Sequence, residues 1–253
     1  MHKRDMPESS WDPVERWYSG LVGEKGHHYH QTLILPNVHR LLAFNETHSL
    51  LDLGCGNGVL ARSLPKEIEY VGVDSAAKLL RDAKKMTKGG QFIQADATRT
   101  LPVKKRDFDR ACFILSLQNM EDGLGAITQA KQHLKTHGKL LIVLNHPAFR
   151  IPRQSAWGED IAAKMRYRRI NAYMSPMKIP IQMHPGKQEQ SQMTYSYHQP
   201  LSVYSTWLFQ LHFAIEIIEE WCSPKTSEGK NAKMEDRARR EIPLFMAILA
   251  RSE

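Results

Sequence analysis

Cysteine is scarce in this chain of 253 residues, and long apolar runs are absent. The three cysteines, Cys55, Cys112 and Cys222, lie far apart and form no CxxC pair. This spacing argues against a disulfide framework and against a cysteine-rich zinc site. The longest apolar runs, Leu140 to Leu144 and Leu244 to Ala250, fall far short of the ~20 residues that a membrane-spanning helix needs. The sequence therefore predicts a chain without a membrane span and without a metal site.

The first 13 residues, MHKRDMPESSWDP, contain no apolar stretch of the ~7–15 residues that a secretory signal requires. We therefore expect a cytoplasmic protein, and reduced thiols fit that setting. The chain has 35 Lys and Arg against 27 Asp and Glu, which gives a net charge of +8. This charge favours anionic partners such as nucleic acid, phosphorylated metabolites or an acidic membrane surface, without choosing among them.

Short apolar runs rich in strand-forming residues alternate with helical patterns between Ser49 and Leu144, which is typical of a parallel sheet with crossover helices. Strands are predicted at Ser49–Leu53, Glu69–Asp74, Gln91–Ala95, Asp109–Leu115 and Lys139–Leu144. Helices are predicted at Val59–Leu64, Ala76–Met86 and Gly123–Thr136, the last of them ended by Gly138. The fold class is therefore α/β, with helices on both faces of the sheet.

The pattern changes after Leu144. Residues 146–200 are rich in proline and show no clear succession of strand and helix, so they are interpreted as an insertion that caps the sheet. A helix at Leu201–Phe213, a strand at Ala214–Trp221, a charged loop at Ser223–Glu241 and a last strand at Leu244–Ala250 are predicted to follow. Upstream, Asp12-Pro13 is typical of a helix start, and a second helix is predicted at Asn37–Phe44. The whole chain, 1–253, is expected to be one domain with N-terminal helices (1–45), a ligand-binding core (46–145), a cap (146–200) and a C-terminal segment (201–253).

A glycine-rich turn follows the first predicted strand directly. Gly54, Gly56 and Gly58 allow positive φ and remove side-chain bulk, so the backbone can approach a ligand at the carboxyl end of the strand. A dinucleotide site would need the spacing GxGxxG, whose third glycine would stand at Val59. The spacing here is GxGxG, which disfavours NAD.

The next two predicted strands each end in an acid. Asp74 stands where a carboxylate can accept hydrogen bonds from both hydroxyls of a ribose. Asp96 stands where it can accept from the exocyclic amine of an adenine. Each signal is weak alone, because a glycine turn can lack a ligand and Asp74 could cap the following helix. Together, at three successive strand ends, they predict an adenosine-binding site.

From Leu50 to Leu144, and again over the last two strands, the chain resembles the class I S-adenosylmethionine-dependent methyltransferases. The resemblance implies a Rossmann-like sheet of seven strands, mostly parallel, whose last strand is antiparallel. It implies that S-adenosyl-L-methionine is the cofactor and S-adenosyl-L-homocysteine the product. The glycine loop would hold the methionine portion, and Asp52 would help to position its amino group. The implied cofactor-binding residues are Asp52, Gly54, Cys55, Gly56, Asn57 and Gly58 at the methionine portion, Asp74 and Ser75 at the ribose, and Asp96 and Ala97 at the adenine. Leu115, with the segment 115–119 that it begins, would line the cofactor near its sulfonium.

The acceptor side offers weaker signals. His146 follows the fifth predicted strand and is the candidate base, although Asn145-His146-Pro147 can equally be a turn. His27, His28 and Tyr29 could close over the site, or form an ordinary surface loop. Together with Asn145 and Arg150 they form the predicted acceptor-binding set. Arginines and aromatic residues in the cap predict either a solvated surface or a pocket for an anionic or aromatic acceptor.

The leading functional hypothesis is methyl transfer to a small-molecule acceptor by a monomer or homodimer. An RNA or protein methyltransferase that uses the basic surface is the alternative. It is less favoured because relatives that methylate base amines or glutamine often carry an Asn-Pro-Pro-Tyr-type sequence after the fourth strand, where this chain has Leu115-Ser116-Leu117-Gln118. A catalytically silent cofactor-binding protein is the third hypothesis.

Overall fold

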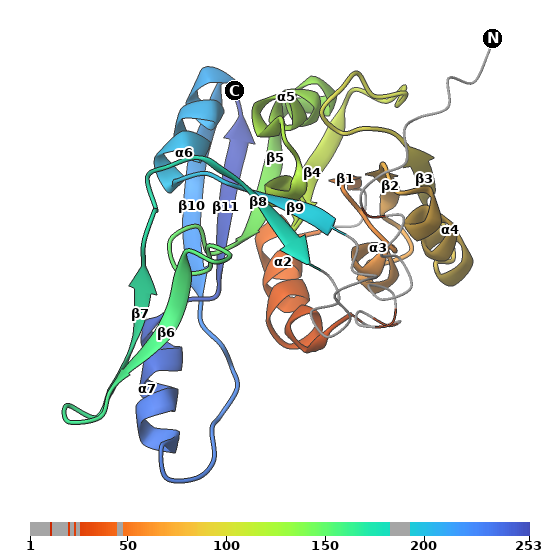
Figure 1. Cartoon of the computed structure of the whole chain (residues 1–253). Helices are drawn as coiled ribbons and strands as arrows, with labels where there is room; N and C mark the ends of the chain where they lie inside the picture. Colours follow the sequence, from red (N-terminus) through yellow and green to blue (C-terminus); the bar gives the residue numbers. More distant parts are fainter. Residues whose placement is uncertain (1–10, 12–19, 21–22, 24–25, 45–47, 183–192) are drawn as a thin grey trace.

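The computed structural model describes residues 11, 20, 23, 26–44, 48–182 and 193–253. A sheet of seven strands runs through the molecule in the order β10-β11-β5-β4-β1-β2-β3 (Figure 1). The strands are β1 (Ser49–Leu53), β2 (Glu69–Asp74), β3 (Gln91–Gln94), β4 (Phe108–Ile114), β5 (Leu134–Asn145), β10 (Phe213–Trp221) and β11 (Phe245–Ser252). All seven predicted strands are therefore present: the five between Ser49 and Leu144 and the two near the C-terminus. Some of their ends differ from the predicted ends by a few residues.

The direction of the strands agrees with the predicted fold class. The strands β3, β2, β1, β4 and β5 pair in parallel, so their carboxyl ends meet at one edge. The last strand, β11, pairs antiparallel with β5 on one side and with β10 on the other. The predicted Rossmann-like sheet with an antiparallel last strand is thus confirmed.

Helices cover both faces of this sheet. Successive side chains of a strand point to opposite faces, so Leu50 and Leu51 enter different hydrophobic clusters. One cluster takes in side chains of α5 (Gly123–His133) and α6 (Leu201–Gln210). The other takes in side chains of α2 (Leu35–Leu42), α3 (Val59–Ser63) and α4 (Ala77–Met86). The central strands are buried on both faces, and their sequences are nearly continuous apolar runs for that reason.

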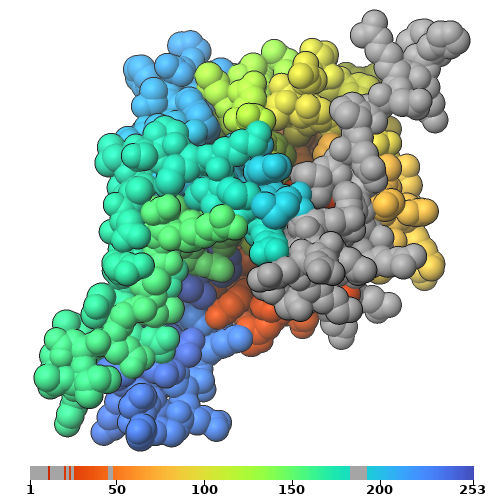
Figure 2. Space-filling model, in the orientation of Figure 1, coloured from red at the N-terminus to blue at the C-terminus, as the bar shows by residue number. Residues whose placement is uncertain are grey.

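Residues 146–200, interpreted as a cap, contain regular structure for which the sequence predicted no elements. The segment forms two antiparallel hairpins, β6 (Ser155–Asp160) with β7 (Met165–Ile170) and β8 (Met177–Gln182) with β9 (Met193–His198). Their side chains are mostly half-buried or exposed, so the strands lack the apolar runs that reveal a core strand. In Figure 2 these hairpins, coloured green to cyan, form much of one face of the molecule.

The charged stretch after β10 is also more regular than predicted. It contains α7 (Ala232–Glu241) in place of a loop through to Glu241. Met234 and Ala238 are its buried residues, spaced four apart on one face. Two small apolar contacts among many charges gave no helical signal in the sequence.

Several element ends differ from the prediction for local reasons. α5 ends at His133, and β5 already begins at Leu134, so Gly138 lies within a strand where it was expected to end a helix. The pairing of β4 with β5 shifts register between Phe108 and Arg110, which accommodates this irregular start. Before the sheet, the π-helix η2 (His30–Ile34) runs directly into α2, which ends at Leu42 before the predicted end at Phe44. The helix predicted at Asp12-Pro13 lies outside the described residues.

None of the helices in the described ranges has both the length and the apolarity to cross a membrane.

The centre of the sheet should carry most of the stability. Ile142 lies in β5 and is 0% exposed, so Ile142→Ala should lower the free energy of unfolding by about 2–5 kcal/mol through lost burial and a residual cavity. Ile218, in the edge strand β10, is 45% exposed and offers a matched control. Urea unfolding should show a change within about 0.5 kcal/mol for Ile218→Ala. Equal losses in the two variants would contradict this assignment of the core.

Candidate cofactor and acceptor site

The glycine loop lies at the carboxyl edge of the sheet and adopts left-handed backbone geometry. Gly54, Gly56 and Gly58 have φ values of 77°, 55° and 77°. The N–H groups of Gly54 and Cys55 both donate to the carbonyl oxygen of Val73, at 2.7 and 3.1 Å. The loop is therefore held against the end of β2, which brings the first two predicted strand ends together.

The carboxylate of Asp74 joins this loop to the next helix. Its Oδ2 accepts a hydrogen bond from the N–H of Gly56 at 2.8 Å, and its Oδ1 accepts one from the N–H of Ala76 at 2.8 Å. The residue that caps α4 is Ala76, so Asp74 does not occupy the N-cap position. Ser75, half-buried between the two, accepts from Gln94 of β3 through its carbonyl oxygen. Asp74 thus lies at the carboxyl edge of the sheet and fixes the conformation of the glycine loop through the hydrogen bond to Gly56.

Asp52 lies beneath the loop and is 2% exposed. The hydroxyl of Tyr70 donates to its Oδ2 at 2.7 Å, and the thiol of Cys112 donates to its Oδ1 at 3.5 Å. Burial raises the pKa of Asp52 to about 6, the two hydrogen bonds oppose this rise, and the charge of Asp74 adds to it. Tyr70 could not be recognised from the sequence as the partner of Asp52, because the contact depends on the parallel pairing of β1 with β2.

Asp96 follows β3 and closes a short turn. Its Oδ1 accepts from the N–H and the hydroxyl of Thr98, at 2.9 and 2.7 Å. Its Oδ2 lies 3.4 Å from the guanidinium of Arg99. Ala97 is buried beside it. The third predicted strand end therefore also presents its acid at the same edge as Asp74.

The end of β4 is strained. Leu115 has a φ of 56°, which is uncommon for a residue with a branched side chain. Its N–H donates to Val143 of β5 at 2.8 Å, and the hydroxyl of Ser116 donates to the carbonyl oxygen of Leu53 at 2.6 Å. These two bonds hold the turn between the ends of β1 and β5, next to Gly54. Ser116 belongs to the segment that the resemblance places near the sulfonium, and its short side chain fits against Gly54.

Three buried polar atoms near the glycine loop lack a hydrogen-bond partner among the described residues. They are Nδ2 of Asn57, a residue that is 1% exposed, Nδ1 of His30, and Oγ1 of Thr87, which would lie 3.2 Å from a Cβ at Gly58. Burial lowers the pKa of His30 to about 4, and the nearby His27 lowers it further. A buried donor without an acceptor is costly unless a ligand or water meets it. Asn57 therefore fits a site that receives a polar ligand, whereas the Cys55 thiol is buried and burial raises its pKa.

The segment from Gly26 to His30 runs along the carboxyl edge toward β11. A Cβ at Gly26 would lie 3.1 Å from Val59, the first residue of α3. At the other end, the ring of Tyr29 lies 5.7 Å from the ring of Phe245, and its hydroxyl lies 3.1 Å from the hydroxyl of Ser223. The rings of His27 and His28 lie 5.9 and 5.4 Å from that of Tyr29. The predicted trio is thus together at the edge of the sheet.

His146 makes contacts with its own chain at both ring nitrogens. Its Nδ1 accepts from the N–H groups of Ala148 and Phe149, at 3.1 and 3.2 Å. Nε2 is consequently the protonated nitrogen, and it donates to Glu220 at 2.6 Å. Burial lowers the pKa of His146, and Glu220 opposes that shift. The hydrogen bonds to Nδ1 are those expected if residues 145–147 form a turn. The role of His146 as a base stays a prediction.

Asn145 and Arg150 flank this turn. The N–H of Asn145 donates to the side-chain oxygen of Gln118 at 2.8 Å, which links the ends of β5 and β4. The guanidinium carbon of Arg150 lies 5.1 Å from the centre of the Phe245 ring. Gln118 belongs to the segment that the resemblance places near the sulfonium. Phe245 was missed as a site residue, since only the pairing of β11 with β5 brings it here.

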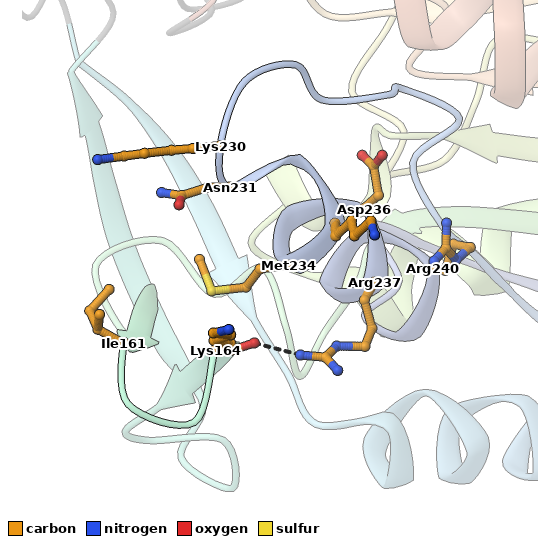
Figure 3. A pocket seen from close by; sticks show the side chains of 9 residues that line it. Ile161, Lys164, Lys230, Asn231, Met234, Asp236, Arg237 and Arg240 are labelled. Atoms are coloured by element: carbon orange, nitrogen blue, oxygen red, sulfur yellow. Dashed lines mark hydrogen bonds between the residues drawn. The ribbon is translucent and has the colours of Figure 1, made fainter.

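A separate cavity of about 730 Å³ lies between the β6–β7 turn and α7 (Figure 3). Cationic side chains dominate its lining, which comprises Ile161, Lys164, Lys230, Asn231, Lys233, Met234, Asp236, Arg237 and Arg240. None of the predicted cofactor residues contributes to it. The cavity is therefore distinct from the carboxyl-edge site.

Comparison with known proteins agrees with this geometry. Residues 51–142 match the family described as a methyltransferase domain. Over 97 residues the chain is 35% identical to a demethylmenaquinone methyltransferase of Thermotoga maritima, covering 37% of this chain and 42% of that protein. It is 30% identical over 125 residues to a trans-aconitate 2-methyltransferase of an Acidovorax species, covering 45% of this chain and 47% of that protein. The chain thus spans less than half the length of these curated relatives.

Solved structures share the fold over most of their length. An S-adenosylmethionine-dependent methyltransferase from Mesorhizobium loti superimposes with a TM-score of 0.65 and 24% identity, over 85% of this chain and 96% of that one. An S-adenosylmethionine-dependent methyltransferase from Clostridium acetobutylicum superimposes with a TM-score of 0.60 and 14% identity, over 96% of this chain and 98% of that one. The chain therefore has the fold of these S-adenosylmethionine-dependent methyltransferases, and its residues 51–142 match a methyltransferase domain, as the sequence resemblance indicated.

The close approach at Gly54 can be tested against a second glycine. A Cβ at Gly54 would lie 2.4 Å from the Cβ of Ser116, whereas one at Gly89, whose φ is also positive, would meet nothing within 4 Å. Gly89→Ala should cost only the backbone strain of about 1–2 kcal/mol. Gly54→Ala should add about 1–3 kcal/mol of overpacking in denaturant unfolding. Equal costs would show that Ser116 does not constrain the loop.

Asp52 should make stability depend on pH. Its folded pKa of about 6 exceeds the ordinary value of 3.8, so its stabilisation is complete below pH 3.8 and is lost as pH rises through about 6. The full loss is about 3 kcal/mol, of which about 2 kcal/mol falls between pH 4.5 and 7.5. Asp52→Asn, which stays neutral, should lack this loss. Urea unfolding of both proteins at the two pH values measures it, and parallel changes would contradict the shifted pKa.

Proposed function

We propose that the chain is an enzyme that transfers the methyl group of S-adenosylmethionine to a small-molecule acceptor. The observation that carries this proposal is the convergence of the glycine loop, Asp74 and Asp96 at three neighbouring strand ends. The match of residues 51–142, which include all of these, to a methyltransferase domain also supports it. The two named relatives methylate small molecules, which supports the acceptor class.

The proposed cofactor site follows from the described contacts. The glycine loop with Cys55 and Asn57 would hold the methionine portion, and the ionised form of Asp52 would attract its ammonium group. Asp74 with Ser75 would hold the ribose, Asp96 and Ala97 the adenine, and Leu115 would line the sulfonium. When bound, S-adenosylmethionine supplies an electrophilic methyl group. The chain then has to orient the acceptor in line with that group and exclude water.

The cap is proposed to help exclude water. Its strand β9 packs against the short helix η3 (Leu117–Asn119), which follows directly on Leu115. Lys178 of β8 and Tyr197 of β9 both bond to Glu121, at 3.3 and 3.2 Å. This hairpin is therefore tied to the turn after β4. His27, His28 and Tyr29 would cover the same edge from the other side, with Asn145 and Arg150 facing the acceptor.

Proton removal needs a base only for some acceptors. His146 follows β5 at the carboxyl edge, where a base could reach the acceptor. To accept a proton, it would have to lose either the hydrogen bonds that Nδ1 accepts from Ala148 and Phe149 or the hydrogen bond of Nε2 with Glu220. An acceptor that is already anionic needs no base at all. The cytoplasmic location and the monomeric or dimeric state stay predictions.

Labelled methyl transfer tests the proposal. Purified protein with S-adenosylmethionine labelled in its methyl group should label a small-molecule extract and leave RNA and protein pools unlabelled. Asp74→Ala should reduce transfer at least tenfold, because the loop loses a charge-assisted hydrogen bond and the ribose its acceptor. Asp107→Ala removes a carboxylate from an exposed ion pair and should leave transfer unchanged. Label in RNA alone would instead establish the alternative function.

A further inference from the structure

Arg150 is a half-buried cation without an anion. It follows β5 by one turn, and its N–H donates to the carbonyl oxygen of His146 at 2.9 Å. Among the described residues, no carboxylate lies within ion-pair distance of its guanidinium. Burial lowers the pKa of Arg150, which reflects the cost of removing the guanidinium from water. The ring of Phe245, 5.1 Å away, offsets only part of that cost.

A second guanidinium makes the local charge more positive. Nε of Arg168, in β7, donates to the carbonyl oxygen of Phe149 at 2.7 Å, and Nη2 donates to the hydroxyl of Ser155 at 2.9 Å. Both acceptors are neutral, and the first belongs to the residue before Arg150. The charge of Arg168 lowers the pKa of Arg150 further. Two like charges near one another, with no described acid between them, are expected where an anion binds.

The position of Arg150 links it to the proposed acceptor space. Phe245, under the guanidinium, pairs in register with Asn145 at the carboxyl end of β5. Tyr29, which contacts Phe245, belongs to the segment that reaches the glycine loop at Val59. β11 is two strands away from β4, which corresponds to roughly 10 Å across the sheet. A small molecule can span that distance between Arg150 and the end of β4.

We infer that Arg150 binds a carboxylate of the methyl acceptor, with Arg168 as a positioning residue that raises the local positive potential. The inference rests on the proposed function, because it names the substrate class of the same site. A planar carboxylate matches a single guanidinium in a two-point contact. Nε and Nη2 of Arg168 already donate to Phe149 and Ser155, so the two-point contact falls to Arg150. The acceptor is thus a small carboxylic acid with its reactive end toward Leu115.

Calorimetric titration of the protein saturated with S-adenosylhomocysteine tests the inference. The probes are a panel of mono-, di- and tricarboxylates that includes trans-aconitate, with inorganic phosphate as a comparison. At least one carboxylate should bind more tightly than phosphate. Arg150→Gln should weaken that binding at least tenfold, and Arg150→Lys should recover part of it, since the charge remains and the two-point geometry is lost.

The matched control removes a charge elsewhere. Arg240 is an exposed arginine in the cavity of Figure 3, and Arg240→Gln should leave carboxylate binding unchanged. All three variants should bind S-adenosylhomocysteine like the wild type. Equal weakening by Arg150→Gln and Arg240→Gln, tighter binding of phosphate, or no carboxylate binding by the saturated wild type would each overturn the inference. Failure of the wild type to bind S-adenosylhomocysteine would instead contradict the proposed function.

Discussion

The hydrogen bond from the N–H of Gly56 to the carboxylate of Asp74 is the interaction on which the site depends. It fixes a loop whose three glycines all have positive φ, a geometry that costs most residues free energy. The same carboxylate accepts from Ala76 and so also sets the start of α4. One side chain at the end of β2 therefore connects the loop after β1 to the next crossover, and the ligand-facing edge is assembled around it.

Charge is distributed unequally along that edge. The half formed by β1, β2 and β3 carries Asp74 and Asp96 at its edge and Asp52 buried beneath the glycine loop, and these acids suit a ligand with an ammonium group and hydrogen-bond donors. The half formed by β5, β11 and the first hairpin presents Arg150 and Arg168. A cationic cofactor and an anionic acceptor would thus each meet groups of opposite charge. This separation would also disfavour binding of either ligand in the other half.

The sequence predicted the parts of the structure that depend on local pattern. The bounds of β1 and β2 agree with the prediction, because each is a short apolar run with a turn residue after it. The glycine loop and the acids at strand ends could be placed from spacing alone. Contacts across strands, such as Tyr70 with Asp52 or Phe245 with Arg150, could not be found this way, since they depend on register. The two hairpins and α7 were missed because exposed strands and a helix with only two buried residues leave little apolar periodicity.

The most direct test of the account is calorimetric titration of the purified wild-type protein with S-adenosylhomocysteine, beside an identical titration with NAD. Three acids and a GxGxG loop at one edge predict micromolar binding of S-adenosylhomocysteine and no detectable binding of NAD. Binding of NAD in preference, or no binding of S-adenosylhomocysteine to folded protein, would contradict the assignment of this edge as a methyltransferase cofactor site.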